Sequence, residues 1–204
     1  MKRLVLMLIS LVLTLPLHAQ EQTLISGPID NGGFGGPVVK FSQIDNKFAL
    51  LVGGYGGWLI NHSFMIGGGG FGLANNIRGS RAAQIYYGTG DNLRLQFGYG
   101  GFMLEYIGEP NSLIHYNVSA LIGAGGVNYD YIDNASWPYN DNFGDASACF
   151  VFEPSAGAEL NVTQFFRIDA GASYRLVRGT DLVGISDSQL SDFAVNLTFK
   201  FGKF

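Results

Sequence analysis

The chain has 204 residues, of which 47% are hydrophobic, 14% aromatic and only 14% charged, and its net charge is −4 at neutral pH. This acidic balance, with no stripe of Lys and Arg, argues against a nucleic-acid-binding protein. The single cysteine, Cys149, cannot form an internal disulfide, and no Cys or His residues have the spacing of a zinc site. We therefore expect no metal and no cofactor, and a fold held together by backbone pairing and packing.

The N-terminus has the pattern of a secretory signal peptide. Lys2 and Arg3 give a positive start, residues 4–17 are apolar, and the small Ala19 ends a cleavage site. We expect cleavage after Ala19, since the apolar stretch is too short for the alternative, a stable membrane anchor. Cleavage removes two cations and leaves a mature net charge of about −6.

Glycine clusters flanked by aromatic residues recur along the mature chain. They lie at 48–58, 64–71, 95–102 and 121–127. No window approaches the ~18 consecutive apolar residues of a membrane helix, and the glycines lack the three-residue period of collagen. The interleaved apolar residues argue against disorder. These segments instead indicate β-strands in which glycine permits bends and close backbone approach.

The alternation of apolar and polar residues predicts eight strands behind an N-terminal extension over 20–33. We place them at 34–44, 48–60, 63–74, 93–107, 113–127, 148–160, 165–177 and 191–204. From the second strand onward, short connections alternate with long ones. Outer-membrane barrels have short periplasmic turns and long outer loops, and an even strand number puts both termini in the periplasm.

Each predicted strand has one apolar and one polar face. In the last strand the apolar face comprises Phe193, Val195, Leu197, Phe199 and Phe201. Alternation alone also fits a soluble β-sandwich, whereas a membrane barrel turns the apolar face to lipid and the polar face to its lumen. The signal peptide, the loop lengths and the terminal Phe204 favour an all-β, eight-stranded, antiparallel up-and-down barrel over 34–204 in a bacterial outer membrane.

With these features the chain resembles the small eight-stranded outer-membrane barrels of the OmpA/OmpX type. In the final strand, Phe199, Phe201 and Phe204 resemble the C-terminal signal by which such barrels are recognised for assembly. The resemblance implies outer-membrane lipid and the barrel-assembly machinery as partners. Because Phe204 falls on the polar face, we expect a local break at 202–203 that returns it to the apolar face. No counterpart of the periplasmic cell-wall-binding domain of the OmpA family is expected.

The inward parity predicts a polar network inside the barrel. Its expected members are Lys40, Arg94, Glu105, His115, Glu153, Glu159, Arg167, Asp169, Arg175 and Lys200. Buried charges must pair, and hairpin folding sets Glu159 opposite Arg167 and Glu105 opposite His115. Eight strands leave room for side chains or one small ligand, so we expect a plugged interior rather than a narrow channel or pocket.

Glycines on the inner face are the feature that would widen the interior. The expected inward glycines are Gly98, Gly123, Gly125, Gly157 and Gly171. Because the glycine clusters belong to the second to fifth strands, a pocket, if present, should lie against that half of the wall.

Some small outer-membrane barrels modify lipid A, which makes an enzyme one alternative. His115 and Ser119 share the predicted inner face, but four strand residues separate them by about 13 Å. A nucleophile and its base need a hydrogen bond of about 2.6–3.2 Å. We therefore expect no catalytic residues and no enzyme.

The long loop at 128–147 is rich in acidic and aromatic residues. Its candidates for contact with an extracellular protein or glycan are Tyr129, Tyr131, Asp133, Trp137, Tyr139, Asp141 and Asp145. The acidic residues lack the EF-hand pattern, and the aromatic residues would also fit an interfacial girdle. In the loop at 75–92, residues 82–87 have strand character and would extend a hairpin or raise the strand number to ten.

The sequence therefore favours a non-enzymatic outer-membrane barrel with a structural or surface-interaction role through its outer loops. A small transport or ligand-binding barrel, a lipid-A-modifying enzyme and a soluble secreted β-sandwich stay open as alternatives.

Overall fold

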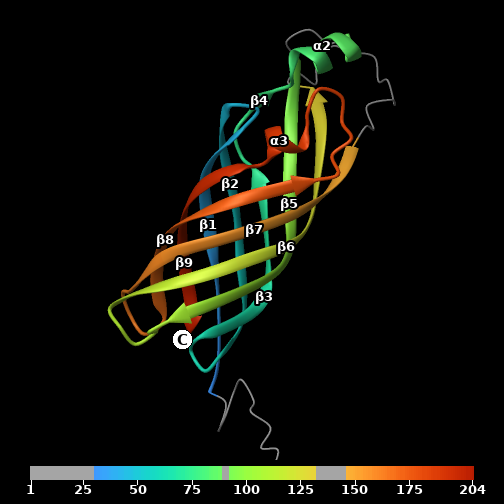
Figure 1. The fold of residues 1–204 in the computed structure, drawn as a ribbon. Coiled ribbons are helices and arrows are strands. Elements are labelled where there is room, and N and C mark those ends of the chain that lie inside the picture. Colours follow the sequence, from blue (N-terminus) through green and yellow to red (C-terminus); the bar gives the residue numbers. More distant parts are fainter. Residues whose placement is uncertain (1–29, 89–91, 132–145) are drawn as a thin grey trace, which may run out of the picture.

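A computed structural model describes residues 30–88, 92–131 and 146–204 of the chain. They form a closed antiparallel barrel, drawn in Figure 1 with the C-terminus at one end and the helices at the other. The barrel strands are β1 Asn31–Ile44, β2 Lys47–Ile60, β3 Phe64–Leu73, β5 Leu93–Gly108, β6 Ile114–Tyr131, β7 Ala146–Asn161, β8 Phe166–Arg178 and β9 Asp192–Lys203. The prediction of an eight-stranded up-and-down barrel is confirmed.

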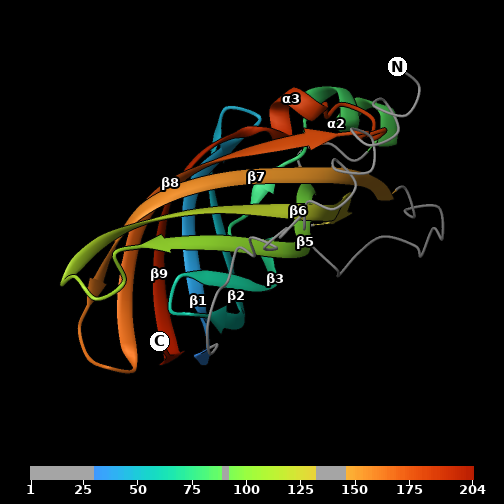
Figure 2. The same ribbon diagram turned by 60° about the horizontal axis from the view of Figure 1, so that its bottom comes forward.

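The sheet closes because its first and last strands pair. β1 runs antiparallel to β9 with Val38 opposite Thr198. The remaining barrel strands pair with their neighbours in the chain, and β3 pairs with β5. A short extra strand, β4 (Ile77–Arg78), pairs with β5 beyond the end of β3. The closed arrangement, turned toward the reader in Figure 2, satisfies the backbone groups that an open sheet would leave at its edges.

The two ends of the barrel differ in their connections. The turn end carries the C-terminus and the short connections 61–63, 109–113 and 162–165. The loop end carries the described connection 179–191, helix α2 (Arg81–Tyr87) from the connection between β3 and β5, the ends of β6 and β7 at Tyr131 and Ala146, and a two-residue turn at Asp45 and Asn46. Both turn residues have positive φ, 53° and 57°, as in hairpin turns whose twist matches that of the strands.

Residues 82–87 are helical, so the predicted strand character of this segment is wrong. Helix α2 (Arg81–Tyr87) begins after Ser80, whose side chain accepts a hydrogen bond from the Ala83 N–H at 3.2 Å. It ends at Gly88, which adopts the left-handed conformation with φ of 65°. These two caps satisfy the helix ends and override the local β-propensity. The described part of the chain therefore gives no support for ten barrel strands.

Apolar side chains cover the outer wall of the barrel. Phe102, Val118 and Ile122 are 49%, 46% and 45% exposed, and many other large apolar residues on the outward parity are also exposed. A soluble protein avoids an apolar surface of this extent. Among the described residues, no helix is long and apolar enough to cross a membrane.

Inward glycines let neighbouring strands of the glycine-rich wall approach closely. A Cβ on Gly67 of β3 would collide with the carbonyl oxygen of Gly56, and one on Gly123 of β6 with that of Gly100. Glycine is thus required at these two positions by the space between strands.

Candidate functional site: the barrel interior and its loop end

The half of the interior nearest the turn end contains a buried charge cluster. The ammonium of Lys200 contacts Glu105 at 2.5 Å and also contacts Glu159. Arg167 donates to Glu159 at 2.8 Å, and the Nε2 atom of His115 lies 3.1 Å from the same carboxylate oxygen. All five side chains are nearly or fully buried. Each carboxylate thus has a cationic partner, which buried charges require.

A second group of polar contacts lies around Glu153. Lys40 donates to this carboxylate at 2.8 Å, Tyr99 at 2.6 Å and Ser173 at 2.5 Å. The Lys40 ammonium also lies 3.5 Å from the centre of the Phe71 ring, a cation–π contact. These bonds tie β1, β3, β5, β7 and β8 together across the interior.

Asp169 and Arg175 occupy the interior without a direct ion pair among the described contacts. Asp169 accepts from the Asn117 amide at 2.5 Å. Arg175 is fully buried and donates to two main-chain carbonyls, those of Leu190 at 2.7 Å and Gln43 at 3.2 Å. Among the described residues its Nη1 atom has no hydrogen-bond partner, and its guanidinium lies 5.4 Å from the Phe97 ring centre.

Two predicted pairings differ in detail from the observed register. His115 lies opposite Glu159 on β7, and Glu105 lies opposite Ser119, so the expected pair of Glu105 and His115 is wrong. The reason is that the 109–113 connection is centred two residues later than assumed. The predicted contact of Glu159 with Arg167 is present, although Glu159 lies opposite Asp169. The long Arg side chain reaches it diagonally.

Arg94 was expected inside the barrel and lies outside it. Its guanidinium bonds to Asp130 at 2.6 Å, and the two side chains are 33% and 44% exposed. Leu93, Leu95 and Phe97 point inward instead and are buried. Unbroken alternation along β5 links these residues to the inward Glu105, so Arg94 must take the opposite face. Gly98 follows the same parity and also faces outward, contrary to the prediction.

The cavity found in the interior among the described residues is small. The described cavity has about 20 Å³ and is lined by residues from the whole circumference, including Lys40, Tyr55, Glu153 and Asn196. This is room for about one water molecule. It lies in the centre of the lumen and not against the glycine-rich half. The geometry therefore supports a plugged interior.

The loop end is covered by residues 179–191, which we call the cap and which include α3 (Asp187–Leu190). Three of its apolar side chains, Leu182, Ile185 and Leu190, are buried and belong to the core that fills this end of the barrel. The Tyr129 hydroxyl donates to the Val183 carbonyl at 2.9 Å. Packing and hydrogen bonds thus hold the cap on the barrel.

Backbone contacts to Asp187 order the start of the cap. Its carboxylate accepts from the N–H groups of Thr180 at 2.8 Å and Gly179 at 3.1 Å. These bonds hold the pKa of Asp187 below its ordinary value of 3.8. At the turn end, the Lys203 ammonium similarly lowers the pKa of Asp30, to which it bonds at 3.3 Å.

Phe204 lies inside the turn end, so the expected break at 202–203 is wrong. β9 continues to Lys203, and the Phe204 ring stacks on the inward Phe34 at 5.4 Å between centroids. The Arg167 guanidinium lies 3.9 Å from its centre. These partners hold the Phe204 ring on the inner face of the barrel, whereas Phe199 and Phe201 of β9 point outward.

Most of the loop residues predicted to bind a partner lie outside the described residues: Asp133, Trp137, Tyr139, Asp141 and Asp145. The same holds for the Tyr131 side chain. Tyr129 is only 5% exposed and lies among the inward residues at the loop end, so its prediction as a surface contact is wrong. Sequence reasoning also missed α2, whose Ile85 and Tyr86 are 73% and 66% exposed. The available signal was Ser80 and Gly88, residue types that suit the N-cap and the C-cap of a helix, with seven residues between them.

No group of three or more His, Cys, Asp or Glu side chains that could hold a metal occurs within the described ranges. His115 uses Nε2 on Glu159, and its Nδ1 lies 3.1 Å from the Ser112 carbonyl oxygen. Its hydrogen bonds therefore orient it within the charge cluster and not toward Ser119.

Comparisons with known proteins show which solved structures this fold is similar to. No protein-family model and no curated protein matches the sequence. The structure is similar to that of Neisserial surface protein A, with a TM-score of 0.56 and 12% identity over 87% of this chain and 100% of that one. It is also similar to the N-terminal β-barrel domain of Pseudomonas aeruginosa OprF, with a TM-score of 0.52 and 15% identity over 86% and 99% of the chains. The chain thus has the fold of the small outer-membrane barrels, and the resemblance inferred from its sequence is confirmed at the level of fold.

Proposed function

We propose that the protein is an exported, non-enzymatic β-barrel of a bacterial outer membrane that serves as a rigid platform for surface interactions at its loop end. The observation that carries this proposal is the closed barrel whose interior is filled by paired charges toward the turn end and by apolar side chains toward the loop end. An apolar outer wall fits hydrocarbon, and a plugged interior fits a role that requires no passage through the barrel.

The loop end supplies the surface for such an interaction. α2 presents the exposed side chains of Ile85 and Tyr86, and Arg81 begins the same helix. Tyr and Arg are among the residue types enriched at protein interfaces. The partner proposed is an extracellular protein or glycan, bound by α2 and by the 132–145 segment.

Export and assembly belong to the same proposal. A cleaved signal peptide ending at Ala19 would deliver the chain across the inner membrane, and Phe199 and Phe201 would present the outward aromatic face of β9 to the assembly machinery. Mass spectrometry of the mature protein tests the cleavage site. Membrane fractionation with heat-modifiable gel migration tests the location, since a folded outer-membrane barrel is expected to migrate differently before and after boiling.

The function is tested by cell-surface binding and by conductance. Cells that produce the wild-type protein are compared with cells that produce Ile85→Ser/Tyr86→Ser for adhesion to glycan arrays and to immobilised extracellular-matrix proteins. The proposal expects a loss of binding in the double variant at equal surface abundance. Purified protein in planar bilayers is expected to give no discrete current steps; regular steps would favour the transport alternative.

A further inference from the structure

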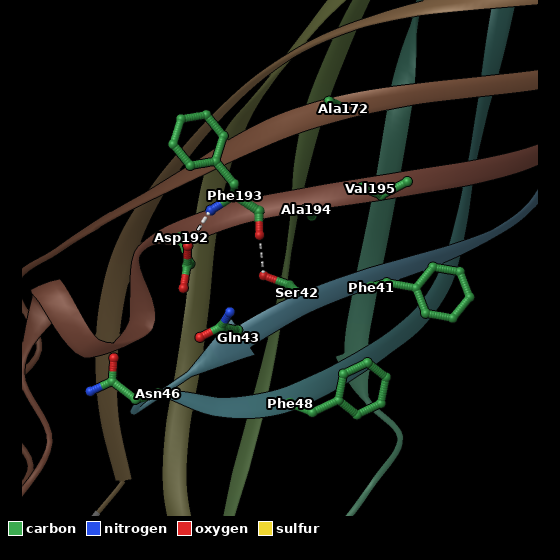
Figure 3. A pocket seen from close by; sticks show the side chains of 10 residues that line it. All are labelled: Phe41, Ser42, Gln43, Asn46, Phe48, Ala172, Asp192, Phe193, Ala194 and Val195. Atoms are coloured by element: carbon green, nitrogen blue, oxygen red, sulfur yellow. Dashed lines mark hydrogen bonds between the residues drawn. The ribbon is translucent and has the colours of Figure 1, made fainter.

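The two strands that close the barrel separate near the loop end. β1 and β9 pair between Gly33 opposite Lys203 and Ser42 opposite Ala194, with a break at Gly36 and Pro37, and they do not pair beyond Ser42. β1 nevertheless continues to Ile44 and β9 begins at Asp192. Figure 3 shows the two strands diverging at this point.

Specific side chains satisfy backbone groups at the separated ends. The Ser42 hydroxyl donates to the Phe193 carbonyl at 2.7 Å, and the buried Arg175 donates to the Gln43 carbonyl at 3.2 Å. On the other side, the Asp192 carboxylate accepts from the Phe193 N–H at 2.7 Å. In an apolar surrounding, unpaired backbone groups are very costly. These bonds therefore stabilise the separation, which is a built feature of the wall.

A groove of about 500 Å³ occupies this separation, and we call it the seam notch. Its apolar walls are Phe41, Phe48, Phe193 and Val195, which are 46%, 59%, 69% and 62% exposed. Ala172 of the neighbouring β8 also lines the groove and leaves space beside Phe193 (Figure 3). The walls are continuous with the outward apolar band of the barrel, so hydrocarbon is the material that this surface contacts.

One end of the seam notch is polar. Gln43, Asn46 and Asp192 lie there together, with the Asp192 carboxylate pointing toward the two amides (Figure 3). The only hydrogen bond of the Asp192 side chain among the described contacts is the one from Phe193, and no described ion pair neutralises it. The notch thus combines an apolar slot with an anionic, amide-bearing end.

The charge of Asp192 determines which kind of molecule the seam notch can bind. A carboxylate at the polar end favours a cationic group that donates hydrogen bonds, and the amides of Gln43 and Asn46 can donate to phosphate oxygens. An anionic head without a cation would be repelled by Asp192. A flat surface of a second barrel would leave the groove unfilled.

We propose that the seam notch binds one membrane lipid whose head carries a primary ammonium and a phosphate. An acyl chain lies along Phe41, Phe48, Phe193 and Val195, the ammonium bonds to Asp192, and the phosphate accepts from Gln43 and Asn46. This inference relies on the membrane location proposed above and adds a lipid site to it.

The test is native mass spectrometry of the full-length protein, purified in detergent and mixed with equal amounts of three lipids. Phosphatidylethanolamine carries the primary ammonium, phosphatidylcholine keeps the charge but lacks ammonium N–H donors, and phosphatidylglycerol is anionic. We expect one molecule of phosphatidylethanolamine to be retained in preference to the other two. Asp192→Asn should lower its retention up to about fivefold, as for a partly exposed ion pair.

Two filling variants test the slot separately from the head site. Val195→Trp and Ala172→Leu each place extra volume in the notch and should abolish the retained lipid. The matched control is Ile122→Trp, at an outward and similarly exposed position on β6, away from the seam; it should keep wild-type retention.

Two results would overturn the lipid site. One is equal retention of the three lipids by the wild-type protein, and the other is undiminished retention by both filling variants. Gel migration before and after boiling is recorded for every sample. A folded barrel without lipid preference refutes only the notch, whereas a protein that never forms a detergent-stable barrel also refutes the membrane location.

Discussion

The two halves of the barrel interior are stabilised by different physics. At the turn end, Lys200, Glu105, Glu159 and Arg167 form a network of buried ion pairs. At the loop end, inward residues such as Phe97 and those of the cap form an apolar core. The same alternation of inward and outward side chains runs through both halves. It decides which face of the wall a residue takes, but not whether the inward residues are polar or apolar.

The difference has a consequence for how each half responds to change. A buried ion pair is sensitive to the loss of either partner, since the remaining charge has no solvent. An apolar core responds to lost volume in proportion to the cavity created. The buried charge cluster of the turn end should therefore tolerate no single charge deletion. The loop end should tolerate polar changes at its surface but no truncation in its core.

The largest effect is expected at Lys200. Lys200→Met leaves Glu105 and Glu159 short of their shared cation and should lower the free energy of unfolding by about 3–5 kcal/mol. Urea unfolding in lipid vesicles, followed by tryptophan fluorescence, measures it. Lys203→Met is the control, because Lys203 is 71% exposed and its surface pair contributes at most about 1 kcal/mol. A loss for Lys200→Met no larger than that of the control would remove the distinction between the two halves.

The cap supplies the corresponding test at the loop end. Leu190 is fully buried, and Leu190→Ala should lower the free energy of cap opening by about 3 kcal/mol through lost packing. Limited proteolysis of the 179–191 segment reports this opening while the barrel stays folded. Ile85→Ala, at a 73% exposed position of α2, should change it by less than about 0.5 kcal/mol. Equal protease resistance of wild type and Leu190→Ala would show that the cap is not held by its core contacts.

The contrast between the polar turn end and the apolar loop end also explains how much of this structure the sequence predicts. The strand positions follow from alternation and loop length, and the largest shift is at the end of β6, placed at residue 127 and observed at Tyr131. The alternation also places most of the charged residues of the turn end. The prediction that Arg94 points inward was wrong, because it assigned polar residues to the inner face everywhere. Near the loop end the inner face is apolar, so Arg94 points outward.

Other errors arise where a contact distant in sequence decides the outcome. Phe204 takes the inward face because Phe34 and Arg167 provide a site for its ring, and neither lies near it in the chain. The cap packs into the barrel through Leu182, Ile185 and Leu190, which read as ordinary loop residues in a sequence. The seam notch depends on where β1 and β9 stop pairing, and the alternation of one strand contains no information on that point.

Phe204 allows a smaller test of the polar half. Phe204→Leu keeps an apolar side chain but removes the cation–π contact with Arg167 and the stacking on Phe34, and we expect a loss of about 1 kcal/mol. The urea unfolding measurement used for Lys200 applies here. Phe165→Leu, at a 62% exposed position of the same end, should be close to neutral. A neutral Phe204→Leu would mean that the inward ring contributes packing volume alone.

The smallest effect concerns pH and the cap. The pKa of Asp187 is lowered by the Thr180 and Gly179 N–H groups, so its ionised form stabilises the folded cap. That contribution is fully present above the unfolded pKa of about 3.8 and is lost as pH falls through the lower folded value.

Pepsin measures this effect because it acts in the acidic range. Cap cleavage, normalised to an unfolded peptide substrate at each pH, should accelerate as pH falls below about 3.8 in the wild type. Asp187→Asn should already be faster above that pH and show no further rise. Asp181→Asn is the control in the same segment, since among the described hydrogen bonds Asp181 takes part through its backbone N–H, which donates to the Ser147 hydroxyl. The charged turn end should not open over this step, because its ion pairs are buried. If the turn-end strands became cleavable together with the cap, the two halves would unfold as one unit.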